Sequence, residues 1–273
     1  MKLSRAPRGL SFLRVYLGVA ALAAATLGGF TSLTSAAVGS QAGAGNAMAA
    51  GRARLGYRSR QGEHACRPNL AERLRTTLGA AQLMTVEASD FGTSVAVVET
   101  WSREGGCWQP AGGPWPALIG AHGFSDHHRE GDGTTPTGIY RIAPTVYGND
   151  PNPGYRGPYH RLVCGDWWDE DPTSPTYNTF QHVPCGVEPS FGPKSEALWT
   201  EGLYYPSFAV VEYNRHPVVP YAGSGIFVHA ATGAPTLGCV SIPKADLDMF
   251  LRWLDPAKAP AIVMAPTSEM EGF

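Results

Sequence analysis

The sequence predicts a mainly β domain with few helices and many turns. From residue 94 onward, short runs rich in Val, Ile, Phe and Tyr recur, usually bounded by Gly, Pro or Asn. The 33 Gly and 23 Pro residues show no collagen-like triplet period, so they mark turns. An apolar share of 43% with 16% charged residues is typical of a chain with a packed core and excludes a disordered one.

Residues 1–36 have the pattern of a secretory signal. They begin with four basic residues, Lys2, Arg5, Arg8 and Arg14. The uncharged run Val15–Phe30 follows, and residues 34–37 offer small-residue cleavage sites. We therefore expect export of the chain with cleavage of this segment. The alternative is an uncleaved membrane anchor, although the run is short for the roughly 20 residues that a spanning helix needs.

Residues 37–62 are rich in Ala, Gly and Ser without apolar periodicity, which predicts a flexible linker before a folded domain over residues 63–273. Loss of residues 1–36 would remove four of the 21 Lys and Arg residues, leaving 17 against 23 Asp and Glu and a net charge near −6. That balance argues against nucleic acid as a partner, because phosphates attract basic patches. Export would also place the chain where disulfides persist.

Two helices are expected in the folded domain. Leu70, Leu74 and Leu78 recur at helical spacing and predict a helix over residues 69–83. The second prediction is a helix over residues 244–254, with Pro243 near its first turn and Pro256 beyond its end. Four apolar side chains of this second segment share one face: Leu247, Phe250, Leu251 and Leu254.

Six β-like runs lie between and beyond these helices. They are Ser94–Trp101, Ala117–Ile119, Gly138–Ile142, Phe208–Tyr213, Gly225–Ala231 and Ala261–Met264. Strands that outnumber helices in this way argue against a doubly wound α/β fold.

Residues 147–199 form a long, aromatic, turn-rich stretch, which we interpret as a loop insertion that forms a wall of the substrate cleft. Trp167, Trp168 and Tyr177 either stack on sugar rings or pack beneath the loop, and packing is the favoured interpretation. The acidic run over residues 169–171 is interpreted as a solvated turn.

Five cysteines allow fifteen arrangements of two disulfides and one free thiol. Cys164 and Cys185 bracket one turn-rich stretch, and Cys66 and Cys107 both lie in the N-terminal part. Cys239 sits apart, after a predicted strand and before a predicted helix. We therefore predict the disulfides Cys66–Cys107 and Cys164–Cys185, with Cys239 free.

Cys239 has the surroundings of a nucleophile. Gly238 allows a tight turn, whose backbone N–H groups would stabilise an oxyanion. His229 lies ten residues earlier, and the intervening excursion would return Cys239 beside it. A neighbouring imidazole takes the thiol proton and leaves the reactive thiolate. The alternative is a small, inert, buried cysteine, and spacing alone does not decide between the two.

Two segments carry a family resemblance. The first, IFVHAATGAPTLGCVSI, contains His229, Thr236, Gly238 and Cys239. The second, EGDGTTPTGIYRI (residues 130–142), contains Thr-Pro-x-Gly. In this order they resemble the signature of the L,D-transpeptidase catalytic domain (YkuD-type) over roughly residues 94–264. The resemblance implies a β-sandwich or barrel with few helices and a long loop insertion.

The motif departs from its common form at two positions. Leu237 stands where that form has His, and Ser241 stands where it has Arg or Asn. The spacing from His229 to Cys239 is also shorter than in many members. The chain is therefore similar to a divergent branch with a Thr-x-Gly-Cys motif.

The resemblance implies acyl transfer on peptidoglycan stem peptides without a cofactor. Cys239 would be the nucleophile, His229 the general base and then acid, and the Gly238 backbone part of the oxyanion site. An amine acceptor would give a crosslink, whereas water would make the enzyme an L,D-carboxypeptidase. A catalytically inert wall-binding domain is the non-enzymatic alternative.

Further polar residues are candidates for contacts with the stem peptide: Thr236, Arg129, Asp132 and Asn214. Either a backbone carbonyl or Asn214 would orient His229. The histidines His122, His127 and His128 crowd one Gly-rich segment, but their spacing fits no HExxH-like pattern, so we expect no metal site.

Overall fold

Fourteen strands and two short α-helices make up residues 65–273, the part of the chain that the computed structural model describes. The mainly β prediction is confirmed. The signal predicted over residues 1–36 and the linker predicted over residues 37–62 lie outside the described residues.

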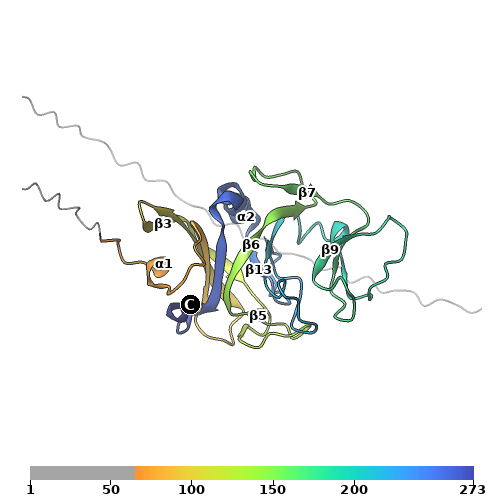
Figure 1. Cartoon of the computed structure of the whole chain (residues 1–273), viewed down its shortest axis with the longest axis horizontal. Helices are drawn as coiled ribbons and strands as arrows, with labels where there is room; N and C mark the ends of the chain where they lie inside the picture. Colours follow the sequence, from red (N-terminus) through yellow and green to blue (C-terminus); the bar gives the residue numbers. More distant parts are fainter. Residues whose placement is uncertain (1–64) are drawn as a thin grey trace, which may run out of the picture. The chain divides into compact units, whose positions relative to one another are not determined.

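The largest sheet closes on itself (Figure 1). Its strands are β1 (Gln82–Ala88), β2 (Val95–Glu104), β3 (Cys107–Leu118), β6 (Gly138–Gly148), β7 (Tyr159–Arg161), β11 (Phe208–Val211), β12 (Phe227–Ala230), β13 (Val240–Ile242) and β14 (Ala261–Pro266). They are ordered β11–β12–β13–β3–β2–β1–β14–β6–β7, and β6 pairs with β11 as well. Pairing between β6 and β11 therefore forms a barrel, from which β7 extends.

The second predicted helix is confirmed almost to the residue. Helix α2 spans Lys244–Trp253, with Pro243 as its N-cap and Leu254 as its C-cap. It packs against β12 and β3. Leu247, Phe250 and Leu251 are fully buried in the cluster that fills the barrel. An apolar face at helical spacing thus becomes part of the main core.

The first predicted helix is wrong over most of its length. Helix α1 spans only Leu70–Arg73, and the chain turns extended at Leu74. Leu78 and Gly79 have positive φ angles of 53° and 71°, a left-handed conformation that ends any helix. The last residues of the predicted segment enter β1, which pairs with β2 and β14 on either side. Tertiary pairing therefore overrides the leucine periodicity here.

The insertion over residues 147–199 contains more regular structure than predicted. Besides β7 it holds β8 (Asp166–Asp169), β9 (Thr179–His182) and β10 (Glu196–Ala197), which form a separate sheet in the order β10–β8–β9. Strands of two to four residues are too short for period-two patterning to reveal. The remaining short elements are β4 (Phe124–Ser125), β5 (Thr135–Pro136) and the 3₁₀ turns Leu198–Thr200, Pro256–Lys258 and Met270–Gly272.

Aromatic residues of the insertion pack inward. Trp168 and Tyr177 are 1% and 3% exposed, which confirms packing rather than sugar stacking for these two side chains. The acidic run is not a simple solvated turn. Asp169 is fully buried and accepts hydrogen bonds from the hydroxyls of Ser174 and Thr176.

The cysteines pair as predicted. Cys66 and Cys107 join the segment before α1 to the start of β3. Cys164 and Cys185 join the two strands at the open end of the β8–β9 hairpin. Cys239 is the free cysteine of the described residues.

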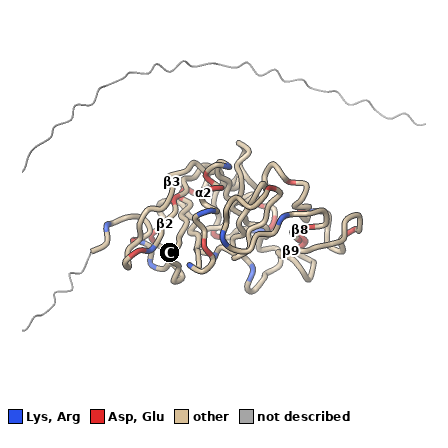
Figure 2. The backbone as a smooth tube through the Cα atoms, turned by 90° about the horizontal axis from the view of Figure 1, so that it is seen from above, with Lys and Arg blue, Asp and Glu red and all other residues tan. Residues whose placement is uncertain are grey.

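Charged residues are dispersed over the described surface. Figure 2 shows basic and acidic positions interspersed along the tube, without a basic stripe. This distribution is unlike the clustered Lys and Arg of a nucleic-acid interface. No helix within residues 65–273 is long and apolar enough to span a membrane.

Leu251→Ala should lower the free energy of unfolding by about 2–5 kcal/mol, because it leaves a cavity in the main core where Leu251 is fully buried. Urea denaturation monitored by circular dichroism measures this change. Met249→Ala on the same helix is the control, because Met249 is 44% exposed, and it should cost less than about 1 kcal/mol. Equal losses for the two variants would contradict the assigned core face of α2.

Candidate active site

The parallel pairing of β12 and β13 brings the two motif residues together. Val228 pairs with Val240, and His229 pairs with Ser241. Cys239 precedes Ser241 by two residues, so its side chain leaves the sheet on the same face as His229. Residues 231–239 alone connect the two strands.

The Thr-Pro segment holds the loop that carries Cys239. The Thr135 hydroxyl donates to the Gly238 carbonyl at 2.8 Å and accepts from the Gly120 N–H at 2.8 Å. Gly238 has a φ of 149°, and a Cβ there would lie 2.9 Å from the Thr134 carbonyl oxygen. Only glycine permits this close approach. The two segments that resemble the family signature are thus in direct contact.

Thr236 shapes the turn from inside. Its hydroxyl donates to the Cys239 carbonyl at 2.6 Å and accepts from the Gly238 N–H at 3.1 Å. The Gly238 N–H is therefore engaged by Thr236 in this structure, and its expected role as an oxyanion donor stays a prediction. Among residues 65–273, no hydrogen bond uses the N–H of Cys239. That group is the available backbone donor at the nucleophile.

The Cys239 side chain is partly buried, and backbone groups hold its thiol. It donates to the Gly225 carbonyl at 3.1 Å and accepts from the Phe227 N–H at 3.3 Å. Burial raises its pKa well above the ordinary value, and the nearby Glu196 carboxyl adds to this rise. The resting group is therefore a neutral thiol at physiological pH.

The His229 ring is also neutral. Its Nδ1 lies 3.0 Å from the Ala230 carbonyl oxygen, an acceptor that fixes the proton on Nδ1 and leaves Nε2 unprotonated. Burial lowers its pKa to about 4. A backbone carbonyl therefore orients the imidazole, whereas the Asn214 amide makes its hydrogen bonds to Val219 and Gly223 within its own turn.

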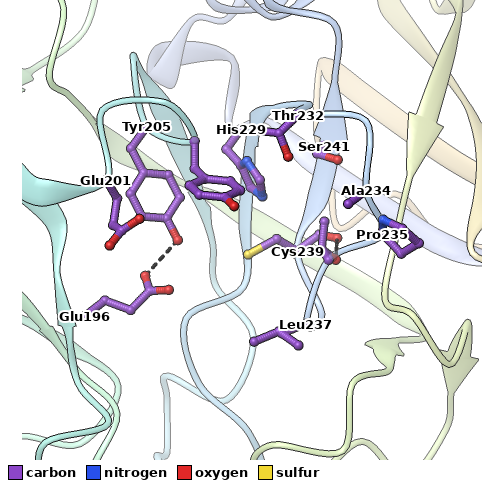
Figure 3. Close-up of a pocket in the computed structure, with 12 residues that line it drawn as sticks. Glu196, Glu201, Tyr205, His229, Thr232, Ala234, Pro235, Leu237, Cys239 and Ser241 are labelled. Carbon is purple, nitrogen blue, oxygen red and sulfur yellow. Dashed lines mark hydrogen bonds between the residues drawn. The ribbon is translucent and has the colours of Figure 1, made fainter. Parts of the chain in front are cut away.

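Both side chains line one cavity of about 230 Å³ (Figure 3). The sulfur is directed toward Tyr205 and Glu196, while the imidazole lies beside it on the neighbouring strand. Within the described residues, no hydrogen bond joins the thiol to the imidazole. Rotation of the Cys239 side chain about its Cα–Cβ bond is needed to bring the sulfur to Nε2.

Sequence reasoning missed the acidic residues beside the sulfur. Glu196 lies on β10 of the insertion and accepts a 2.7 Å hydrogen bond from the Tyr205 hydroxyl. Burial raises the Glu196 pKa to about 7. Glu170 lies farther along the same wall, and burial raises its pKa above the ordinary value. No local pattern marks either residue, because only the fold of the insertion carries them to Cys239.

Two other candidates lie away from the cavity that holds Cys239 and His229. Arg129 is exposed, and its backbone N–H donates to the Asp132 carboxylate. Asp132 also accepts from the backbone N–H and hydroxyl of Thr134 and contacts His128. These bonds stabilise the loop before β5, so both residues support the Thr-Pro segment. Thr236 is the predicted candidate that does line the cavity.

Close groups of potential metal-ligand atoms are the places in the fold where a metal ion could bind. In the described part of the chain, Cys66, Glu72 and Cys107 form the one close group of such atoms. The two cysteines of that group are joined in a disulfide, so their sulfurs are not thiolate ligands.

Comparisons with known proteins bear on this geometry. The family model described as the L,D-transpeptidase catalytic domain, YkuD, matches residues 108–263. Among solved structures, the chain is similar to the helical cell shape determining protein Pgp2 from Campylobacter jejuni, with a TM-score of 0.33 and 13% identity. The match covers 72% of this chain and 54% of that one, so this chain spans about half the length of that structure. No curated protein matches the chain.

Thr236→Val should lower the free energy of unfolding by about 1–3 kcal/mol, because it removes two hydrogen bonds and leaves the Gly238 N–H without an acceptor. Chemical denaturation gives the value. Thr232→Val is the matched control, since Thr232 lines the same cavity but is exposed. An unchanged stability in Thr236→Val would argue against the bracing role of its hydroxyl.

Proposed function

The chain belongs to the YkuD family of L,D-transpeptidase catalytic domains, and on that premise we propose that it crosslinks peptidoglycan stem peptides through a Cys239 thioester. The observation that carries this proposal is the convergence of an unpaired cysteine and a neutral histidine in one cavity. The match of the family model supports the substrate class, because it includes both motif segments.

The first step is acylation of the thiol. After rotation of its side chain, Cys239 gives its proton to Nε2 of His229 as the sulfur attacks the carbonyl between an L-centre and a D-residue. Negative charge develops on the carbonyl oxygen, and the unengaged N–H of Cys239 is placed to donate to it. His229 then protonates the departing amine, and the acyl group remains on sulfur as a thioester.

The second step transfers the acyl group to an acceptor. An amine of a second stem peptide attacks the thioester carbonyl, the C–S bond breaks, and a new amide joins the two stems. Water in place of the amine would release a trimmed peptide. The apolar side chain of Leu237 is 84% exposed at the rim of the cavity, and an exposed apolar rim suits a peptide ligand.

The proposed location is outside the cytoplasm. Two disulfides within a chain that carries a signal-like N-terminal sequence support it, because disulfides persist in oxidising compartments. Stem peptides of the cell wall would be available there.

Cys239→Ala should abolish acylation and crosslinking. Mass spectrometry of the intact protein with a carbapenem tests acylation, and analysis of muropeptides after incubation with stem peptides tests transfer. Met249→Ala on the exposed face of α2 is the control and should acylate as the wild type, because Met249 is 44% exposed and does not line the cavity.

Each outcome of that experiment has a meaning. Crosslinked dimers from the wild type support transpeptidation, whereas trimmed tripeptides alone would indicate an L,D-carboxypeptidase. Activity that survives in Cys239→Ala would overturn the cysteine mechanism, and a wild type without acylation would indicate an inert domain.

The acylation rate should fall as the pH drops through about 4, the pKa of His229. His229 accepts the thiol proton only when neutral, and burial lowers its pKa to about 4, so protonation removes the base only in that acidic range. Stopped-flow measurement of carbapenem acylation at each pH provides the profile. An acidic limb centred between pH 6 and 7 would contradict an imidazole with this depressed pKa.

A further inference from the structure

A second cavity adjoins Cys239 on its acidic side. Its volume is about 320 Å³, and it shares Cys239, Glu196 and Leu237 with the cavity of about 230 Å³ that contains His229. Its wall adds Glu130, Glu170 and Lys194. We call this space the acidic chamber. The nucleophile therefore lies between two cavities, one with an imidazole and one with carboxyl groups.

The sheet of the insertion positions two of these carboxyl groups. Glu196 pairs with Trp168 across β10 and β8, and Glu170 lies two residues beyond Trp168. Both side chains line the acidic chamber. The backbone N–H of Glu170 donates a hydrogen bond to the Ser195 hydroxyl at 3.0 Å, and this bond holds the chain in place where it leaves β8. The Glu170 carboxyl in turn reaches Gly225, where an added Cβ would lie 2.1 Å from its Oε1.

The carboxyl groups differ in their partners. Glu130 accepts hydrogen bonds from the hydroxyls of Tyr177 and Ser224, and Glu196 accepts one from Tyr205. The Glu170 side chain is partly buried and its carboxyl group lines the chamber, yet no hydrogen bond or ion pair from residues 65–273 reaches that carboxyl group. Lys194 is exposed at the wall and forms no ion pair within the described residues. An acceptor that faces a cavity without a protein partner is available to a ligand that donates.

We propose that the acidic chamber binds the ammonium group of the acyl acceptor and that Glu170 accepts its proton. This inference rests on the proposed transpeptidase function. Two enclosed carboxyl groups side by side repel each other when charged, and a cation between them relieves both the repulsion and the loss of solvent. The chamber opens beside the sulfur that would carry the acyl group, so the bound amine lies next to the thioester.

The transfer step balances with these groups. The acceptor arrives as R–NH₃⁺, and Glu170 takes one proton to leave R–NH₂. The amine lone pair forms the new C–N bond, and the C–S bond breaks with its electrons on the Cys239 sulfur. A second amine proton passes to that sulfur through His229. The products are an amide, a thiol and a neutral carboxylic acid, and no other reactant is consumed.

The electrostatics favour this role. Burial raises the pKa of Glu170 and also that of Glu196, to about 7. A carboxylate with a raised pKa is a stronger base, so proton transfer from an ammonium group costs less free energy. Burial raises the pKa of the Cys239 thiol, and negative charge on Glu196 and Glu170 adds to this rise.

Glu170→Gln tests the proposal when acylation and transfer are measured separately. The variant should form the acyl-enzyme with a carbapenem no more slowly than the wild type, because loss of a negative charge lowers the thiol pKa. With a stem tripeptide that carries a diamino acid as acceptor, KM should rise and transfer should fall by about tenfold or more. Transfer to hydroxylamine, a nucleophile that is neutral at pH 7.5, should change by less than about threefold, which also verifies that the variant is folded.

Two controls sharpen the result. Glu188→Gln removes the same charge from an exposed position of the insertion and should behave as the wild type. Lys194→Met should lower KM for the cationic acceptor, since it removes a competing cation from the chamber wall. A loss in Lys194→Met equal to that in Glu170→Gln would mean that Lys194 is the natural partner of Glu170, and it would overturn the proposal.

The remaining outcomes separate the inference from the proposed function. If the wild type acylates and crosslinks but Glu170→Gln matches Glu188→Gln, the acceptor site is wrong and the transpeptidase function stands. If Glu170→Gln loses transfer to hydroxylamine as strongly as transfer to the cationic acceptor, the carboxylate does not act on the ammonium group. A wild type that never acylates at Cys239 overturns both proposals.

Discussion

The nine-residue connection between β12 and β13 is the constraint on which the site depends. Parallel neighbours usually need a crossover of a dozen or more residues, so this loop has little length to spare. The backbone of Thr236 in this loop forms hydrogen bonds with Ile119 and Ala121, just beyond the end of β3. The chain then returns and places Cys239 beside β12. Gly238 and Thr135 make that return possible by close backbone contact and a hydrogen bond.

Burial then determines the charges of the site. The same packing that holds Cys239 and His229 on one face also removes solvent from both, so the thiol and the imidazole are neutral. A neutral imidazole is a base at physiological pH, and a neutral thiol is protected from unspecific oxidation. Activation therefore depends on a movement of the thiol and on the charges that a ligand brings.

The insertion over residues 147–199 adds acidic side chains to the site around Cys239. Its small sheet is closed at one end by the disulfide between Cys164 and Cys185, and it places Glu170 and Glu196 against the sulfur. These carboxyl groups lie far from the motif in the chain, in a stretch where short strands and turns hide any periodicity. The acidic run at residues 169–171 illustrates the difficulty, because its three side chains have three environments: Asp169 is buried, Glu170 faces the chamber and Asp171 caps a turn.

The β class, helix α2, both disulfides and the candidate residues Cys239 and His229 could all be predicted from the sequence. These features depend on local patterns, on cysteine positions and on one short motif, all of which are legible along the chain. Three features emerge only in the folded chain: helix α1 ends at Arg73, the Gly238 N–H is engaged, and a backbone carbonyl orients His229. The acidic chamber is a fourth such feature, because its lining residues come from distant segments of the chain. Each of these features depends on which polar groups find hydrogen-bond partners after distant segments pack together. No single segment of the sequence contains that information.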